Sequence, residues 1–101
     1  MIELNAMNFE KEVKNIKGTV LIDFFATWCG PCRMLSPIIE EIDKEMKGTI
    51  KVCKCNVDEN GELAAAFNVS SIPLLVVIRD GKIVQESMGY KDKSQVMKLL
   101  K

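Results

Sequence analysis

The sequence contains no histidine, and this absence removes several kinds of chemistry at once. Without an imidazole, the chain can form no Cys-His nucleophile pair, no histidine-containing zinc site and no imidazole acid or base. An excess of either charge is also missing, because 14 Lys and Arg residues balance 14 Asp and Glu residues. We therefore expect no nucleic-acid partner and no attraction to anionic lipid.

Long apolar runs are missing as well. No stretch approaches the roughly 18 apolar residues of a membrane-spanning helix, and residues 1–13 show neither the basic start nor the apolar centre of a signal peptide. We therefore expect no membrane partner and a protein kept in the cytoplasm. In that reducing compartment, the four cysteines are more typical of catalysis or metal binding than of a disulfide framework.

The sequence contains enough apolar residues to form one hydrophobic core. The chain has 101 residues, of which 48% are hydrophobic. This size is common for one domain and leaves no room for a second. We expect a single domain over residues 1–101, working as a monomer.

Along the sequence, the spacing of apolar residues alternates between the pattern typical of helices and the pattern typical of strands. Two strongly apolar runs, residues 19–26 and 74–78, are typical of central strands covered on both faces. Asp80-Gly81 predicts a hairpin turn, and Asp92 with Gln95 resembles a capping box at the start of a last helix. Further strands are predicted at 1–4, 49–57 and 82–89, and helices at 8–17, 32–47 and 58–67.

The predicted order is thus β-α-β-α-β-α-β-β-α. Strands that alternate with helices and then end in a hairpin indicate an α/β sandwich with a mixed sheet. Its early strands should be parallel and its late strands antiparallel. No internal repeat or linker interrupts this pattern.

Cys29 and Cys32 stand between the end of an apolar strand and the start of a helix. Free backbone N–H groups and the positive end of the helix dipole stabilise a thiolate there, which makes Cys29 a nucleophile near neutral pH. The spacing brings Cys32 back beside Cys29, one helical turn on. Cys29 could then attack a substrate disulfide, and Cys32 could resolve the mixed disulfide.

The segment WCGPC at residues 28–32, after the strand VLIDFFA, resembles the active site of the thioredoxin family. The resemblance continues through KCNVDEN at 54–60, SIP at 71–73, the Asp-Gly hairpin and Gly89, and so covers essentially the whole chain. It implies a thioredoxin-like three-layer sandwich and a protein-disulfide reductase. No bound cofactor is implied, because the redox group is the Cys29–Cys32 disulfide itself.

The resemblance also implies roles for individual residues. Cys29 matches the attacking cysteine, Cys32 the resolving cysteine, Asp23 a buried carboxylate, and Pro73 a cis-proline that faces the disulfide. The surface on which target proteins dock would comprise Trp28, Gly30, Pro31, Ile72, Met88 and Gly89. Lys54 would lie near Asp23 and offset part of the cost of burying its charge.

Several of these residues have plainer interpretations. Asp23 and Lys54 could be ordinary solvated strand residues, Pro73 could be a trans proline that begins a strand, and Trp28 could belong to the core. The family pattern does not explain Cys53 and Cys55. Two positions apart on a strand, they fit best as small buried hydrophobes.

Two other functions compete with disulfide reduction. All four cysteines could form a zinc or iron site, although the spacing C-x2-C-x20-C-x-C lacks a second C-x2-C. Alternatively, the fold could serve as a non-catalytic adaptor. The resemblance favours a reductant of disulfide-containing target proteins, recharged by a thioredoxin reductase that is either NADPH/flavin-dependent or ferredoxin-linked.

Overall fold

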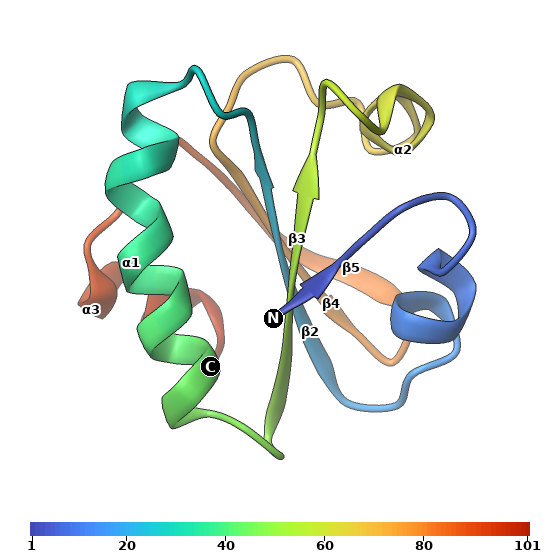
Figure 1. The fold of residues 1–101 in the computed structure, drawn as a ribbon. Helices are drawn as coiled ribbons and strands as arrows, with labels where there is room; N and C mark the ends of the chain where they lie inside the picture. Colours follow the sequence, from blue (N-terminus) through green and yellow to red (C-terminus); the bar gives the residue numbers. More distant parts are fainter.

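A five-stranded sheet with helices on both faces forms the frame of the computed structural model, which describes residues 1–101 (Figure 1). The predicted α/β class and the predicted order of elements are confirmed. The elements are β1 Ile2–Glu3, η1 Glu10–Lys14, β2 Thr19–Phe25, α1 Gly30–Glu45, β3 Ile50–Asn56, α2 Gly61–Ala66, β4 Leu74–Arg79, β5 Lys82–Met88 and α3 Lys93–Leu99. None of the helices is long and apolar enough to cross a membrane.

The sheet is mixed, with the strand order β1-β3-β2-β4-β5. β3 runs parallel to both β1 and β2, whereas β4 is antiparallel to β2 and β5 is antiparallel to β4. The predicted change from parallel to antiparallel pairing is therefore confirmed. β2 lies at the centre, and every residue from Val20 to Phe24 is buried, as a strand covered on both faces requires.

The hairpin between β4 and β5 follows from the sequence Asp80-Gly81. Both residues have positive φ, 53° and 82°, which is the geometry of the two-residue turns that suit the twist of paired strands. A Cβ at Gly81 would also lie only 2.9 Å from the carbonyl oxygen of Lys14. Glycine is required at this position both by the turn and by the close approach of η1.

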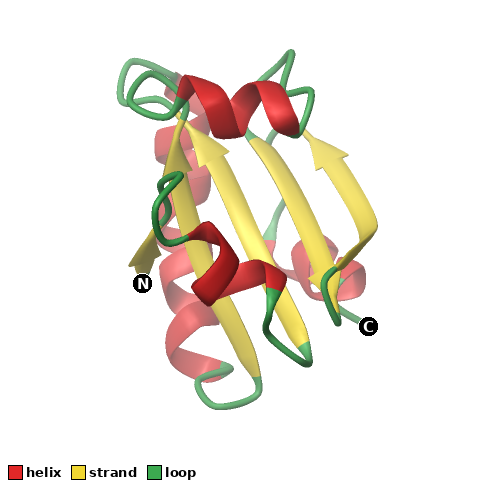
Figure 2. Ribbon diagram, turned by 90° about the vertical axis from the view of Figure 1, so that its right-hand side faces the viewer, coloured by secondary structure: helices red, strands yellow, loops and turns green.

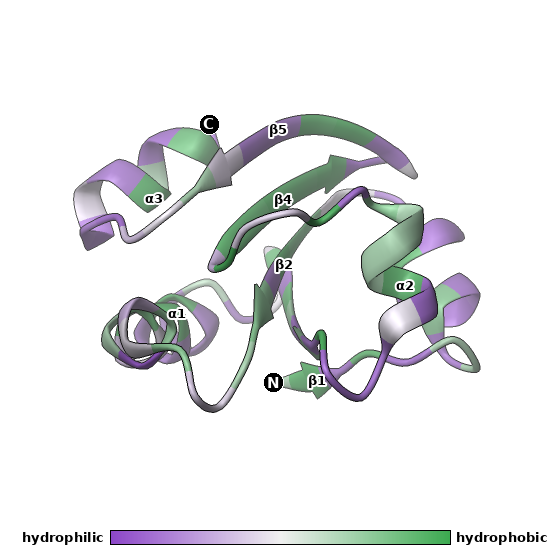
Figure 3. Ribbon diagram, turned by 90° about the horizontal axis from the view of Figure 1, so that it is seen from above, coloured by the Kyte–Doolittle hydropathy of each residue, from purple (hydrophilic) through white to green (hydrophobic).

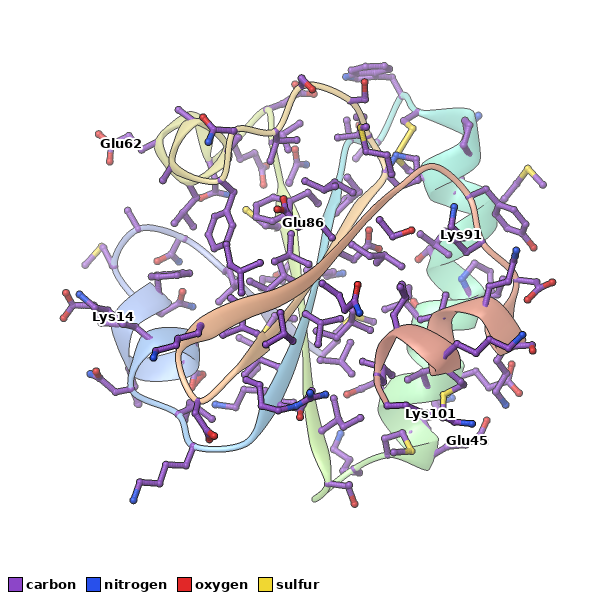
Figure 4. The ribbon with its side chains drawn as sticks, turned by 180° about the vertical axis from the view of Figure 1, so that it is seen from behind. Lys14, Glu45, Glu62, Glu86, Lys91 and Lys101 are labelled. Atoms are coloured by element: carbon purple, nitrogen blue, oxygen red, sulfur yellow. A yellow bond between two sulfur atoms is a disulfide. The ribbon has the colours of Figure 1, made fainter.

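The helices divide between the two faces of the sheet. Figure 2 shows η1 and α2 in front of the strands, with α1 and α3 behind them. Seen from above in Figure 3, the apolar strands β2 and β4 lie between α1 on one side and α2 on the other. In Figure 4 the labelled charged side chains Lys14, Glu45 and Glu62 lie at the rim of the molecule. The three layers follow from burying both faces of one apolar sheet.

Each face of the sheet has its own core. The face covered by η1 and α2 buries 11 residues, among them Val13, Phe24 and Leu63. The face covered by α1 and α3 buries 10 residues, including Leu35 and Val96. The sheet thus separates two apolar layers, and a side chain's place in the strand alternation decides which layer it enters.

The first predicted helix is shorter than expected. The sequence pattern predicts a helix over residues 8–17, but the structure has only the five-residue π-helix η1. Asn8 is held in a turn instead, because its backbone N–H donates to Asn5 Oδ1 and its side chain donates to the Glu3 carbonyl. Asparagine side chains that bond to nearby backbone groups compete with helix formation in this way.

The other helix starts agree better with the sequence. Both hydrogen bonds of the predicted capping box form at α3, between Asp92 and Gln95. α1 begins two residues earlier than the predicted residue 32, with Cys29 as its N-cap. The start of α1, the end of β2 and the loop before β4 meet at the upper edge of the molecule in Figure 1.

Candidate active site

Cys29 and Cys32 form a disulfide at the N-terminus of α1, with their Cα atoms 5.2 Å apart. Cys29 is extended, with φ −86° and ψ 114°, and the helix begins directly after it. The backbone N–H of Cys32 donates to Cys29 Sγ at 3.3 Å. An N–H group at a helix N-terminus stabilises negative charge on that sulfur once the disulfide is reduced. Figure 4 shows the disulfide at this end of α1.

Most of the disulfide is covered by protein. Cys29 is 6% exposed and Cys32 is 2% exposed, and both pack against the fully buried Ala26. Phe25, Val57 and Ile72 complete this small apolar cluster. Of the two cysteines, Cys29 is therefore the more accessible to solvent.

The loop before β4 closes over the disulfide. The Ile72–Pro73 peptide bond is cis, and Pro73 is buried. The carbonyl oxygen of Ile72 lies 3.9 Å from Cys29 Sγ. The N–H of Gly89 donates to the Pro73 carbonyl at 2.8 Å, which fixes the end of β5 against this loop. The sequence-predicted residues Ile72, Pro73 and Gly89 are thus adjacent to the disulfide or to one another.

Apolar side chains are exposed around the disulfide. Trp28 is 68% exposed and Met88 is 58% exposed, so the alternative that Trp28 belongs to the core is wrong. A Cβ at Gly30 would meet no atom within 4 Å, which leaves the backbone there open to an approaching chain. The indole N–H of Trp28 donates to Asp58 Oδ2 at 2.8 Å. Asp58 lies in the segment KCNVDEN, but no local pattern predicts its contact with Trp28, 30 positions away.

Asp23 is the one buried charged residue, at 4% exposure. Its Oδ1 atom is buried and has no hydrogen-bond partner. Burial raises the pKa of this carboxyl to about 7, although the positive charge of Lys54 opposes the rise. Near neutral pH, such a group can both hold and release a proton.

Asp23 and Cys32 line the same cavity of about 200 Å³. Lys54 lies opposite Asp23 in the parallel pairing of β2 and β3, and it lines this cavity too. Thr27 and Ser36 add two hydroxyl groups. The sequence could have indicated Ser36, because it lies four residues after Cys32 and therefore on the same face of α1. A cavity of this size with several polar groups can hold water between the carboxyl and the sulfur.

Cys53 and Cys55 lie in a different part of the molecule. Both are 0% exposed and belong to the core on the η1 and α2 face of the sheet. Burial raises the pKa of Cys53 to about 12 and the pKa of Cys55 to about 11. No cluster of three or more Cys, Asp or Glu side chains is arranged to hold a metal ion. The alternative of one site made from all four cysteines is therefore wrong.

Fold and site together define a class of protein. A disulfide at a helix start, beside a cis-proline and above a buried carboxyl, in a mixed α/β sheet, is the arrangement of a thiol–disulfide oxidoreductase.

Comparison with known proteins identifies the family. A sequence model of the thioredoxin family, described as "Thioredoxin", matches residues 1–101. The chain is 48% identical to thioredoxin of Bacillus subtilis over 84 residues, which are 83% of this chain and 81% of that one. It is 45% identical to thioredoxin of Listeria monocytogenes over 94 residues (93% and 89%) and 36% identical to that of Pseudomonas aeruginosa over 100 residues (99% and 93%). The chain belongs to the thioredoxin family.

Family membership fixes the general activity. Thioredoxins are protein-disulfide oxidoreductases, and the redox group in this chain is its own Cys29–Cys32 disulfide. The family also implies two kinds of partner, namely proteins that contain a disulfide and a reductase that returns the pair to the dithiol state.

Proposed function

We propose that Cys29 is the attacking cysteine of a protein-disulfide reductase and that Cys32 resolves the mixed disulfide. In the first step, the Cys29 thiolate attacks one sulfur of the target disulfide and the second target sulfur leaves as a thiolate. In the second step, the Cys32 thiolate attacks Cys29 Sγ and releases the first target sulfur. The target gains two electrons and becomes a dithiol, while the protein becomes the Cys29–Cys32 disulfide.

The position of Cys29 at the start of α1 supports its role in the first step. Cys29 is the N-cap residue, and its Sγ accepts a hydrogen bond from the backbone N–H of Cys32. The first turn of the helix contains no acidic residue. These features favour the thiolate of Cys29. Cys32, which is less exposed and one turn inside the helix, is shielded from a bulky target.

Asp23 is proposed as the base that activates Cys32. The resolving thiol must lose a proton while it is covered by the docked target, so a proton acceptor inside the protein is needed. Asp23 shares a cavity with Cys32, and burial brings the pKa of its carboxyl to about 7. Lys54 lowers the pKa of this carboxyl and thereby keeps part of the Asp23 population able to accept a proton.

Target proteins are proposed to dock on the face around the disulfide. Trp28, Gly30 and Pro31 would contribute from the loop and first turn of α1, Ile72 and Pro73 from the loop before β4, and Met88 and Gly89 from the end of β5. Ile72 lies just before β4 and outside its ladder, so an extended target segment could pair with its backbone next to Cys29 Sγ.

The proposal includes the setting in which the protein works. It acts as a monomer formed by one domain over residues 1–101, in the cytoplasm, without a nucleic-acid or membrane partner. Its reductase is either NADPH/flavin-dependent or ferredoxin-linked. Balanced charge and the intact cysteine pair support this view.

The disulfide at the start of α1 is the observation that carries the proposal, and trapping tests it. Reduced Cys32→Ser protein should accumulate a mixed disulfide with a disulfide-containing test protein, whereas reduced Cys29→Ser protein should not. Mass spectrometry of the adduct identifies the linked sulfur. Trapping through Cys32 instead would overturn the assignment of roles.

The direction of electron flow has a separate test. Equilibration with glutathione should give the Cys29/Cys32 pair a reduction potential below the cytosolic glutathione range of about −220 to −260 mV. A potential well above that range would make the protein an oxidant or isomerase.

A further inference from the structure

Three charged residues lie side by side across three strands of the sheet. Glu3 of β1 is directly opposite Lys54 of β3, and Lys54 is directly opposite Asp23 of β2. Because residues in register on neighbouring parallel strands point to the same face, the three side chains share the face covered by α1. The row runs from the edge of the sheet to its centre.

Exposure falls steeply along this row. The side chain of Glu3 is 80% exposed and that of Lys54 is 36% exposed, whereas Asp23 is 4% exposed. Lys54 forms its ion pair with the outer carboxylate, since Nζ lies 3.8 Å from Glu3 Oε1. The inner carboxylate keeps one buried oxygen without any hydrogen-bond partner. Lys54 therefore lies between two acidic residues in the register of the sheet, and its ammonium group is paired with the exposed one.

We propose that Glu3 is a positioning residue for the Asp23 carboxyl, which it influences by holding the Lys54 ammonium group toward the solvent edge of the sheet. This inference rests on the proposed function, in which Asp23 is the base for Cys32. Glu3 does not touch the disulfide or the target. It acts only through Lys54, by limiting how closely that cation approaches the buried carboxyl.

Other charged groups around Asp23 are few. β3 contributes Lys54, α1 contributes Arg33, which also lines the cavity, and β4 contributes only the apolar Leu75 opposite Asp23. Met1 lines the same cavity, but its amino group is paired with Asp43 at 3.6 Å. Lys54 is therefore the charged group through which a change at the edge of the sheet can reach Asp23.

The direction of the effect follows from the charges. A cation near a carboxyl favours its ionised form and lowers its pKa. When Glu3 is replaced by a neutral residue, Lys54 loses its outer partner and can turn toward Asp23. The Glu3→Gln substitution should therefore lower the pKa of Asp23, and the pH at which the resolving step reaches half its maximal rate should fall with it.

Two measurements test this on the full chain. NMR titration of the Asp23 carboxyl carbon should show a midpoint lower by roughly half a pH unit in Glu3→Gln protein. Rapid-mixing kinetics of target release should show the same displacement of the pH profile. Glu12→Gln is a matched control, because Glu12 pairs at 3.2 Å with Lys51, another lysine of β3. It should leave both midpoints unchanged.

A double-mutant cycle separates action through Lys54 from direct repulsion between carboxylates. In a Lys54→Gln background, the Glu3→Gln substitution should no longer move the Asp23 midpoint. A shift of equal size in that background, or no shift in the single variant, would overturn the proposal. Lys54→Gln alone should raise the Asp23 midpoint. Asp23→Asn tests the base itself: unchanged target release in that variant would overturn the proposed role of Asp23 as the base for Cys32, whatever Glu3 does.

Discussion

The chain carries two pairs of cysteines, Cys29 with Cys32 and Cys53 with Cys55, and none of the four is more than 6% exposed. Low exposure alone therefore does not separate a reactive pair from an inert one. The pairs differ in what surrounds the sulfur atoms. Cys29 caps a helix and receives a backbone N–H, whereas Cys53 and Cys55 lie within the strand β3, among apolar side chains.

This difference decides which thiolates can form. At the helix start, the N–H donor and the helix dipole favour negative charge on sulfur. In the core, burial opposes that charge and raises the pKa of both thiols to 11 or above, even though Lys51 lowers the pKa of Cys53. The backbone at a helix end can thus activate a sulfur atom even where the side chain is almost fully buried.

The largest expected effect is on activity. Cys29→Ser should reduce disulfide-reductase activity by about a thousandfold or more, because the nucleophile is lost. The matched control is the Cys53→Ala, Cys55→Ala double variant, which should keep its activity within about twofold and lose only about 1 to 3 kcal/mol of stability. Both are measured by the reduction of a protein disulfide with a chemical reductant as electron source. Loss of activity in the folded double variant would show that the core pair takes part in catalysis.

The second prediction concerns the reactivity of the thiols themselves. At pH 7, thiols with pKa values of about 11 and 12 have roughly one part in ten thousand or less as thiolate. Iodoacetamide should therefore modify Cys29 of the reduced native protein at least about a hundredfold faster than either Cys53 or Cys55.

Modification of the core pair should become fast only after denaturation. Peptide mass spectrometry at timed intervals, with and without denaturant, checks both statements. Equal rates for Cys29 and Cys55 in the native protein would remove the distinction between the pairs.

The third prediction concerns Asp23. This buried carboxyl lies near Cys32, whereas Cys53 and Cys55 have no buried carboxyl beside them. Folding raises its pKa from 3.8 to about 7, so the unfolded chain releases this proton more readily than the native protein. The contribution of Asp23 to the free energy of unfolding is therefore greatest below about pH 4. It decreases as the pH rises to about 7, by roughly 4 kcal/mol in total. Asp23→Asn should remove this fall and make the oxidised protein more stable above pH 7, while it slows target release.

Urea denaturation at pH 4 and pH 8 measures the difference. The wild-type protein should be distinctly less stable at pH 8 than the Asp23→Asn variant, and the two should agree at pH 4. Asp58→Asn, which removes an exposed carboxyl, should keep the wild-type dependence on pH. An unchanged pH dependence in Asp23→Asn protein would show that Asp23 does not carry the buried proton.

Much of this arrangement could be predicted from local sequence patterns. The apolar runs at 19–26 and 74–78 predict the central strands, and Asp80-Gly81 predicts the hairpin, because residues adjacent in the sequence decide each of these features. The first helix was predicted too long. Its apolar residues Phe9, Val13 and Ile16 do pack into the core, but the hydrogen bonds of Asn5 and Asn8 to nearby backbone hold the chain in a turn there.

The parts of the site formed by residues close together in the sequence could be predicted. Contacts between residues that are distant in the sequence could not be predicted from local patterns. Asp23, Cys29 and Cys32 lie within ten residues of sequence, and the family resemblance supplies Pro73 and Lys54 from elsewhere. Side-chain contacts between distant segments had no local sequence signal. Asp58 bonds to Trp28, and Glu3 pairs with Lys54, only because the sheet and its loops bring distant segments together.

The smallest expected effect concerns the position of the exposed Trp28, next to Cys29 in the sequence. The indole N–H donates to Asp58, and a hydrogen bond of this kind at an exposed site contributes about 0.5 kcal/mol. Asp58→Ala should therefore free the indole, raise KM for a protein disulfide by about twofold and leave kcat unchanged. Glu59→Ala, next in sequence and also exposed, should alter neither constant. A tenfold change in kcat for Asp58→Ala would instead show that the carboxylate acts on the disulfide chemistry and not on the position of Trp28.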